Sequence, residues 1–173
     1  RGSLVGSAIV CAFRSQNSFF QVLPFDVTDS KKINKKKREE IYNYFKLNRG
    51  FNFNYQIIVG KKKFIEKFNI HNVVLQCMKQ SIILLSKKTD TVIIDGKFIP
   101  NGMEDYKVKA LVKADDKINQ VSAASIIAKV YRDKLITKLH LKDNVYQWNK
   151  NAGYGTKNHL DAIYSHGVSK FHR

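Results

Sequence analysis

The chain has 173 residues and a mass of 20.0 kDa. This length fits one domain, is short for two, and is enough to bury a core without disulfides. Lysine and arginine together number 31 against 14 acidic residues, and the resulting net charge of +17 suits a polyanion or an anionic surface. A composition that is generally rich in lysine and asparagine would also explain this charge. Hydrophobic residues make up 43% of the chain, which excludes global disorder.

The two cysteines, Cys11 and Cys77, are too few for a disulfide framework, and each lies in an apolar stretch. This pattern is typical of small buried residues in a reducing compartment, so we expect a cytoplasmic protein. No apolar run approaches the roughly 18 residues of a membrane span, and the chain does not start like a signal peptide. Because an apolar strand begins at Leu4, close behind a first residue that is not Met, we expect a chain trimmed at its start.

The predicted elements alternate between strands and helices, without an internal repeat or a flexible linker. Apolar or alternating segments predict strands over residues 4–13, 19–25, 51–59, 91–95 and 110–113. Helical spacing, caps and terminal glycines predict helices from Lys35 (capped by Asn34) to Gly50, over about 69–86, over 120–139, and from a cap at Thr156 to Gly167. This alternation indicates an α/β layer architecture.

Two aspartates, Asp95 and Asp115, each follow a short buried strand. Carboxylates at the ends of neighbouring strands can converge, and ligands of open α/β sheets gather at such edges. Their hard oxygens suit Mg²⁺ or Mn²⁺ better than zinc, and two such ions can clamp the attacking and leaving oxygens of a phosphodiester. Alternatively, Asp95-Gly96 is a simple turn and Asp115-Asp116 only leads into a helix.

Two other segments have features of nucleic-acid binding. Residues 29–32 place lysines just before a helix, where side chains and terminal amides bind phosphates, although a solvated charged face is the alternative. In residues 153–156, glycines flank Tyr154, whose ring can stack on a sugar or base. An ordinary loop with a packed tyrosine is the alternative there.

Small residues at 122–125 predict close packing of their helix against the sheet, which is a structural role. Lys129 and Arg132, further along that helix, face either a phosphate or water. The histidines and cysteines show no zinc spacing, and no nucleophile motif is present.

Several segments, in the same order along the whole chain, resemble motifs of the ribonuclease HII family. They are Arg1-Gly2-Ser3-Leu4-Val5-Gly6 (the end of Asp-Glu-Ala-Gly-Arg-Gly and the residues after it), residues 29–40 (DSKKL…KKREE), Asp95-Gly96 (VDG), Lys113-Ala114-Asp115 with residues 122–133 (KGD…AAASILAKVxRD), residues 153–160 (GYGTxxHL) and Phe171-His172-Arg173 (the start of IHRRSF). Residues 122–133 and the GYGT segment, taken together, are specific for this family.

The resemblance implies a ribonuclease H-like fold, with a mixed sheet flanked by helices, in one catalytic domain over 1–173 whose residues 139–173 form a C-terminal helical part. It implies an endonuclease that hydrolyses the RNA strand of RNA–DNA hybrids. It also implies nicking on the 5′ side of single ribonucleotides embedded in duplex DNA, as in ribonucleotide excision. The expected cofactor is Mn²⁺ or Mg²⁺, and the expected state is a monomer without a membrane partner.

The resemblance also assigns site residues. Asp95 and Asp115 match two of four metal-binding catalytic acids, and the other two form the Asp-Glu pair expected before Arg1. Among substrate-binding residues, Arg1 and Gly2 match those that recognise the ribose 2′-hydroxyl, and Tyr154 matches the tyrosine at the RNA-to-DNA junction. The remaining substrate-binding residues are Ser30, Lys31, Lys32, Ser125 and Lys129.

Some positions depart from the family pattern. Ala114 replaces the glycine of KGD, Asp116 adds an acid, and Asn151-Ala152 stands where the family often has His-Lys. Without the Asp-Glu pair we expect the chain as written to bind metal poorly and to catalyse little. A basic nucleic-acid-binding domain without catalysis remains an alternative. So does a ribonuclease HIII-like enzyme, although Arg1 argues against it.

Overall fold

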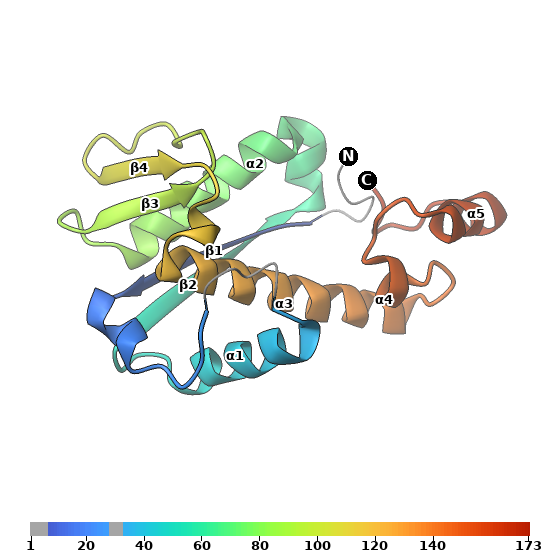
Figure 1. The fold of residues 1–173 in the computed structure, drawn as a ribbon. Coiled ribbons are helices and arrows are strands. Elements are labelled where there is room, and N and C mark those ends of the chain that lie inside the picture. The colour runs from blue at the N-terminus through green and yellow to red at the C-terminus, as the bar shows by residue number, and fades with distance from the viewer. Residues whose placement is uncertain (1–6, 28–32) are drawn as a thin grey trace.

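The computed structural model describes residues 7–27 and 33–173 (Figure 1). It has the predicted α/β class, with helices packed around strands. In chain order the elements are β1 (Ser7–Ser15), the 3-10 helix η1 (Asn17–Gln21), α1 (Lys35–Leu47), β2 (Phe53–Lys61), α2 (Lys62–Leu85), β3 (Thr91–Asp95), β4 (Lys107–Leu111), the 3-10 helix η2 (Ala114–Asp116), α3 (Asn119–Lys142), α4 (Trp148–Asn151) and α5 (Lys157–His166).

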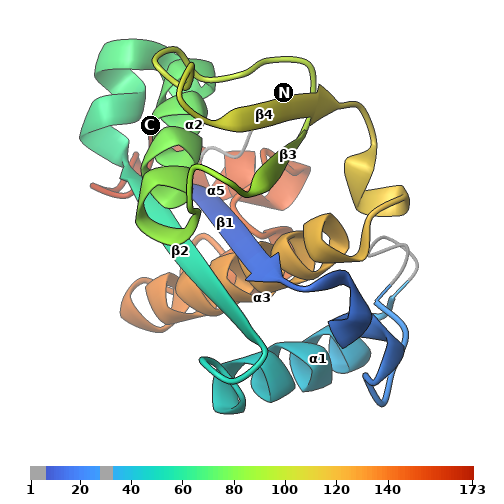
Figure 2. The same ribbon diagram turned by 90° about the vertical axis from the view of Figure 1, so that its left-hand side faces the viewer.

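The strands pair as two separate ladders (Figure 2). β1 runs antiparallel to β2, and β3 runs parallel to β4. Both pairing types of a mixed sheet are therefore present. Within the described residues, the second edge of β1 and that of β3 carry no strand partner.

Helices cover both faces of the β1–β2 ladder, which explains why residues 8–13 of β1 are all apolar. Cys11 and Phe13 pack against a core that also holds residues of α1 and α3, whereas Ala8 and Val10 pack against residues of α2. Side chains that alternate along a strand point to opposite faces. Full burial of aliphatic side chains such as Ile126 stabilises this arrangement by about 1.5–3 kcal/mol each.

One predicted strand is wrong, because residues 19–25 form the end of η1 followed by bends. The consecutive rings of Phe19 and Phe20 both pack around Phe13, at centroid distances of 6.5 and 5.8 Å. A strand would point neighbouring side chains to opposite faces, so this shared packing requires a turn.

The other predicted elements are present with shifted boundaries. The helix expected from about residue 69 begins at Lys62, and Asn69 breaks its geometry with φ 60° and ψ 163°. The Asn69 side chain accepts a hydrogen bond from the Asn72 amide at 3.0 Å and so caps the longer, second stretch. The expected start therefore coincides with an internal cap.

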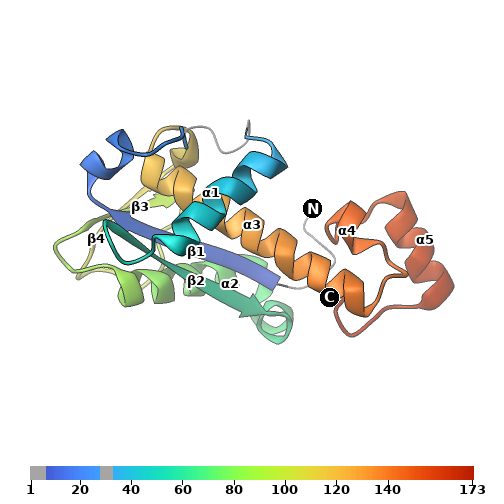
Figure 3. The ribbon, with the colours of Figure 1, turned by 90° about the horizontal axis from the view of Figure 1, so that it is seen from below.

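The C-terminal part lies beyond the end of α3, to one side of the strands (Figure 3). Its own core contains Tyr146 and the fully buried Trp148, packed with Ile136 of α3. Thr156 caps α5 and Gly167 ends it, as predicted. Over the stretches that the structure describes, no helix combines the length and hydropathy needed to cross a bilayer.

Candidate functional site

Asp95 is the last residue of β3 and its side chain is exposed. The next residue, Gly96, has φ 137°, a conformation that favours glycine and turns the chain away from the sheet. Its amide still donates to the carbonyl of Leu111, at 3.1 Å, so the turn is fixed to the end of β4. The short strand thus presents the Asp95 carboxylate at a defined edge.

Asp115 lies in η2, directly after β4, and only 4% of its surface is exposed. The preceding residue, Ala114, donates its backbone amide to Asp95 Oδ1 at 2.9 Å. This bond joins the end of β3 to η2. The structure therefore brings the two aspartates to the same end of the β3–β4 pair, as the sequence predicts.

The alanine that replaces the family's glycine is accommodated without strain at its own position. Ala114 is completely buried within the 3-10 turn, and the left-handed conformation belongs to Lys113, with φ 56°. The extra acid, Asp116, is the last residue of this turn and is exposed. The departures from KGD therefore leave the local backbone able to present Asp115.

The two carboxylates fit a divalent cation in the chemistry of their donor atoms. Asp95 and Asp115 supply only hard oxygens, one group exposed and one buried, which suits Mg²⁺ or Mn²⁺. Within residues 7–27 and 33–173, no cluster of three or more histidine, cysteine or acidic side chains has the arrangement of a metal site. The described part of the chain thus offers two candidate ligands at this edge, Asp95 and Asp115, and further oxygen ligands are needed to complete a coordination shell.

The beginning of α3 packs behind this edge. Ser122 and Ala123 are fully buried, and the Ser122 hydroxyl donates to the carbonyl of Val27, which confirms the structural role expected for the small residues. Ser125 and Lys129 are half-buried instead. Ser125 and Asp95 both line a depression of about 1590 Å³.

This depression separates the two ladders. Its wall includes the edges of β1 and β3 that have no strand partner among the described residues, together with residues of α2 and α3. At the end of β3 opposite Asp95, Arg14 of β1 binds Asp90, with Nε 2.6 Å from Oδ2 and Nη2 3.3 Å from Oδ1. The ladders are therefore bridged by an ion pair at the end remote from the aspartates.

Tyr154 lies in the loop between α4 and α5 and is 48% exposed. The guanidinium of Arg132, on α3, lies 5.1 Å from the centre of its ring and donates to the carbonyl of Ala152 at 2.8 Å. Arg132 therefore faces the tyrosine loop, whereas the sequence predicted a phosphate or water. Its partners are about twenty residues away in the chain, and no local sequence signal identifies them.

The buried side chain of Asn151 holds the same loop through two hydrogen bonds. It is 8% exposed, donates to the carbonyl of Tyr146 at 2.7 Å, and accepts from the Gly153 amide at 2.8 Å. Ala152 and Gly153 both have positive φ, 50° and 77°. The Asn-Ala pair thus takes a structural role in shaping the turn that presents Tyr154.

The remaining predicted site residues, Arg1, Gly2, Ser30, Lys31 and Lys32, lie outside the described residues. Just after them, Asn34 caps α1 by accepting from the Lys37 amide at 2.9 Å, as predicted. Cys11 and Cys77 are free thiols, and burial raises the pKa of each, so neither has the character of a nucleophile.

Comparison with known proteins identifies a family. The sequence model described as ribonuclease HII matches residues 1–173. Ribonuclease HII of Pelagibacter ubique is 44% identical over 173 residues, which cover 100% of this chain and 89% of that protein. Ribonuclease HII of Borrelia hermsii is 38% identical over 175 residues, covering 100% of this chain and 92% of that protein.

Solved structures share the fold at lower identity. Ribonuclease H2 from Pyrococcus horikoshii superimposes with a TM-score of 0.77 at 23% identity, over 100% of this chain and 88% of that chain. A chain from the PCNA:RNase HII complex of Archaeoglobus fulgidus gives a TM-score of 0.76 at 22% identity, over 99% and 87%. These likenesses establish the ribonuclease H-like fold with its helices and C-terminal extension.

Proposed function

The chain belongs to the ribonuclease HII family and is thus a ribonuclease H type of hydrolase, and from this premise we propose its reaction. It hydrolyses the RNA strand of RNA–DNA hybrids and nicks 5′ of single ribonucleotides embedded in duplex DNA. The products carry a 3′-hydroxyl and a 5′-phosphate. The proposed reaction is a two-metal-ion phosphodiester hydrolysis within a single domain, residues 1–173, whose residues 139–173 contribute to substrate recognition.

One observation carries the proposal: the Ala114 amide binds Asp95 Oδ1 at 2.9 Å, so that Asp95 and Asp115 lie at one edge. Two carboxylates at a phosphodiester would repel it unless a cation lies between them. A protein that only binds nucleic acid has no use for such a pair, whereas a metal-dependent nuclease requires it.

The proposed roles follow from this placement. Asp95 and Asp115 would hold Mn²⁺ or Mg²⁺, which when bound supplies Lewis-acid stabilisation of charge on the phosphodiester. Tyr154 is exposed enough for its ring to pack on a sugar at the RNA-to-DNA junction. The other proposed substrate contacts are Ser125 and Lys129 on α3 and, in the remaining segments, Arg1, Gly2, Ser30, Lys31 and Lys32.

The decisive experiment measures nicking of a duplex that contains one ribonucleotide, with and without Mn²⁺ or Mg²⁺. It uses this chain preceded by Asp-Glu-Ala-Gly, the sequence that the family motif places before Arg1. Asp95→Asn should lower the rate by about 100-fold or more while duplex affinity stays near wild type, because a ligand is lost but the phosphate contacts are kept. Asp116→Asn is the matched control and should retain activity. Full activity of Asp95→Asn would exclude Asp95 as a ligand.

The second candidate is a basic binding domain without catalysis, which the net charge of +17 favours. Both candidates predict that binding weakens steeply with salt, because phosphate contacts release counterions. They separate in the nicking assay, since a binding domain gives no divalent-dependent product. A ribonuclease HIII-like enzyme would cut long hybrids but spare the single-ribonucleotide duplex.

A further inference from the structure

Two buried histidines meet in the C-terminal part. His159 of α5 is fully buried, His172 is 5% exposed, and their Nε2 atoms are 2.9 Å apart. The candidate site uses neither side chain. A contact between two ring nitrogens requires that one carries a proton and the other does not.

The partners of His159 settle its tautomer. Its Nδ1 lies 2.8 Å from the backbone carbonyl oxygen of Tyr154, which can only accept, so Nδ1 carries the proton. Its Nε2 lies 3.2 Å from the indole N–H of Trp148, which can only donate, so Nε2 is unprotonated. His159 thus donates to the Tyr154 carbonyl and accepts at its other nitrogen.

The opposite tautomer follows for His172. Because His159 Nε2 accepts, His172 Nε2 must donate. His172 Nδ1 accepts from the Ser169 amide at 3.0 Å and from the Ser169 hydroxyl at 2.9 Å. The hydrogen bonds therefore run in one direction, from Ser169 through His172 and His159 to Tyr154.

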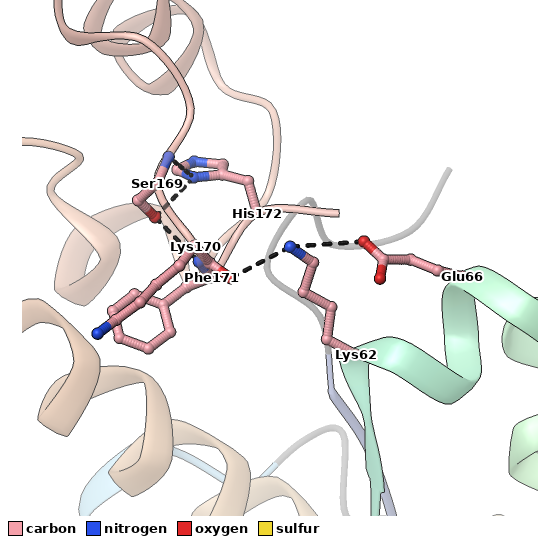
Figure 4. A network of polar contacts seen from close by, with 6 residues as sticks. All are labelled: Lys62, Glu66, Ser169, Lys170, Phe171 and His172. Atoms are coloured by element: carbon pink, nitrogen blue, oxygen red, sulfur yellow. Dashed lines mark hydrogen bonds and ion pairs between the residues drawn. The ribbon is translucent and has the colours of Figure 1, made fainter.

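The segment that carries His172 is itself anchored to the body of the protein (Figure 4). Lys62, at the start of α2, donates to the carbonyl of Lys170 at 3.1 Å and pairs with Glu66 at 3.4 Å. The Ser169 hydroxyl also accepts from the Phe171 amide at 3.2 Å, which closes the turn around His172. The relay thus begins at a fixed point.

We infer that His159 and His172 are positioning residues, which fix the backbone of Tyr154 through this directional relay and thereby set the preference for a ribonucleotide junction. The inference rests on the proposed contact between Tyr154 and the sugar. Arg132 holds the Tyr154 ring and the Ala152 carbonyl from the α3 side, whereas the relay holds the Tyr154 carbonyl from the other. A tyrosine fixed at both ring and backbone can select a substrate shape with little loss of entropy on binding.

Nitrogen NMR of the imidazole rings tests the relay without any need for activity. In the wild-type chain at neutral pH we expect His159 protonated only on Nδ1 and His172 only on Nε2. The exposed His71 and His166 serve as internal references that exchange between tautomers. The same tautomer on both buried rings, or exchange in both, would overturn the relay.

Variants test its role in recognition. The measured quantity is the affinity for a duplex with one ribonucleotide relative to an all-DNA duplex of the same sequence. His159→Leu should reduce this preference by about two- to tenfold, the value of one hydrogen bond. His159→Asn, whose amide can still donate to the Tyr154 carbonyl, should restore part of it. His172→Gln, which keeps an N–H donor, is the milder second variant and should reduce the preference less than His159→Leu.

The matched control is Tyr146→Phe, which removes the hydroxyl bond to the Gly167 carbonyl (2.9 Å) in the same part of the molecule but leaves the relay intact. It should leave the preference unchanged. If Tyr146→Phe and His159→Leu lowered the preference for the ribonucleotide duplex equally, the histidines would have only a general structural role. If the wild-type chain shows no preference, the recognition role falls together with the proposed contact, whereas the tautomer measurement still decides whether the relay exists.

Discussion

The two halves of the candidate site are built differently. The half that carries Asp95 and Asp115 lies at the end of a two-stranded ladder, beside a depression of about 1590 Å³. The strand edges that line this depression have no strand partner within residues 7–27 and 33–173. The half that carries Tyr154 has its backbone held by a hydrogen bond from His159, and it packs on an aromatic core of its own. The first half can accept further ligands and backbone partners, whereas the second is already preorganised.

Trp148→Ala tests whether the C-terminal part depends on its own core. Because Trp148 is fully buried, we expect a loss of about 3–5 kcal/mol in the free energy of unfolding, from lost burial and a new cavity. Urea denaturation followed by circular dichroism measures it. Tyr164→Ala is the matched control, since Tyr164 lies on α5 but is 89% exposed and should change little. An equal effect of the two variants would show that the C-terminal core contributes nothing.

Tyr154→Ala separates recognition from chemistry. We expect nicking at a single ribonucleotide to fall about tenfold while cleavage of a continuous hybrid changes less, because only the junction contact is lost. Tyr154→Phe keeps the ring beside Arg132 and should remain near wild type. Rates on both substrates, measured in the chain preceded by Asp-Glu-Ala-Gly, give the answer. Equal losses on both substrates would remove Tyr154 from junction recognition.

Lowering the pH should reduce the stability of the C-terminal part, which carries Tyr154 and His172. Burial, together with neighbouring His159 and Lys62, lowers the pKa of His172 below its ordinary value of 6.5, although the backbone of Ser169 and the charge of Asp143 partly oppose this shift. The unfolded chain therefore takes up a proton before the folded one. The contribution of neutral His172 to the free energy of unfolding is therefore fully present above about pH 6.5, and it is lost as the pH falls through the lowered pKa of the folded state.

The single tryptophan, Trp148, makes this dependence measurable in the C-terminal part alone. Urea transitions followed by its fluorescence should move to lower urea between pH 7.5 and pH 5.5, by an amount that His172→Gln reduces. A transition that does not respond to pH in the wild-type chain would contradict the prediction.

Local signals predicted much of the fold. The strand Thr91–Asp95 and the caps Asn34 and Thr156 depend on residues close in sequence, and the structure confirms them. The contacts of Arg132 and the pairing of His159 with His172 depend instead on how distant segments pack. Aromatic packing also overrode the strand propensity of residues 19–25. Sequence patterns thus placed the aspartates at strand ends, but they could not identify what holds Tyr154.

Asp90→Asn probes the ion pair that bridges the ladders at the far end of the depression. Arg14 and the Lys87 amide donate to Asp90, and the hydrogen bond from Arg14 is the main cause that lowers its pKa. The two side chains are 41% and 27% exposed, so we expect a loss of only about 0.5–1 kcal/mol at neutral pH. Because the pKa is lowered, this stabilisation is present above about pH 4 and is lost as pH falls further, so wild type and variant should converge in acid.

Asp105→Asn provides the control for this ion pair. Asp105 pairs with Lys88 at 2.7 Å, but both side chains are largely exposed, so its removal should not measurably change stability. A larger effect of Asp90→Asn than of Asp105→Asn in urea denaturation would show that the bridge between the ladders matters. Equal effects would mean that helix packing alone holds the ladders together, since α2 and α3 both line the depression between them.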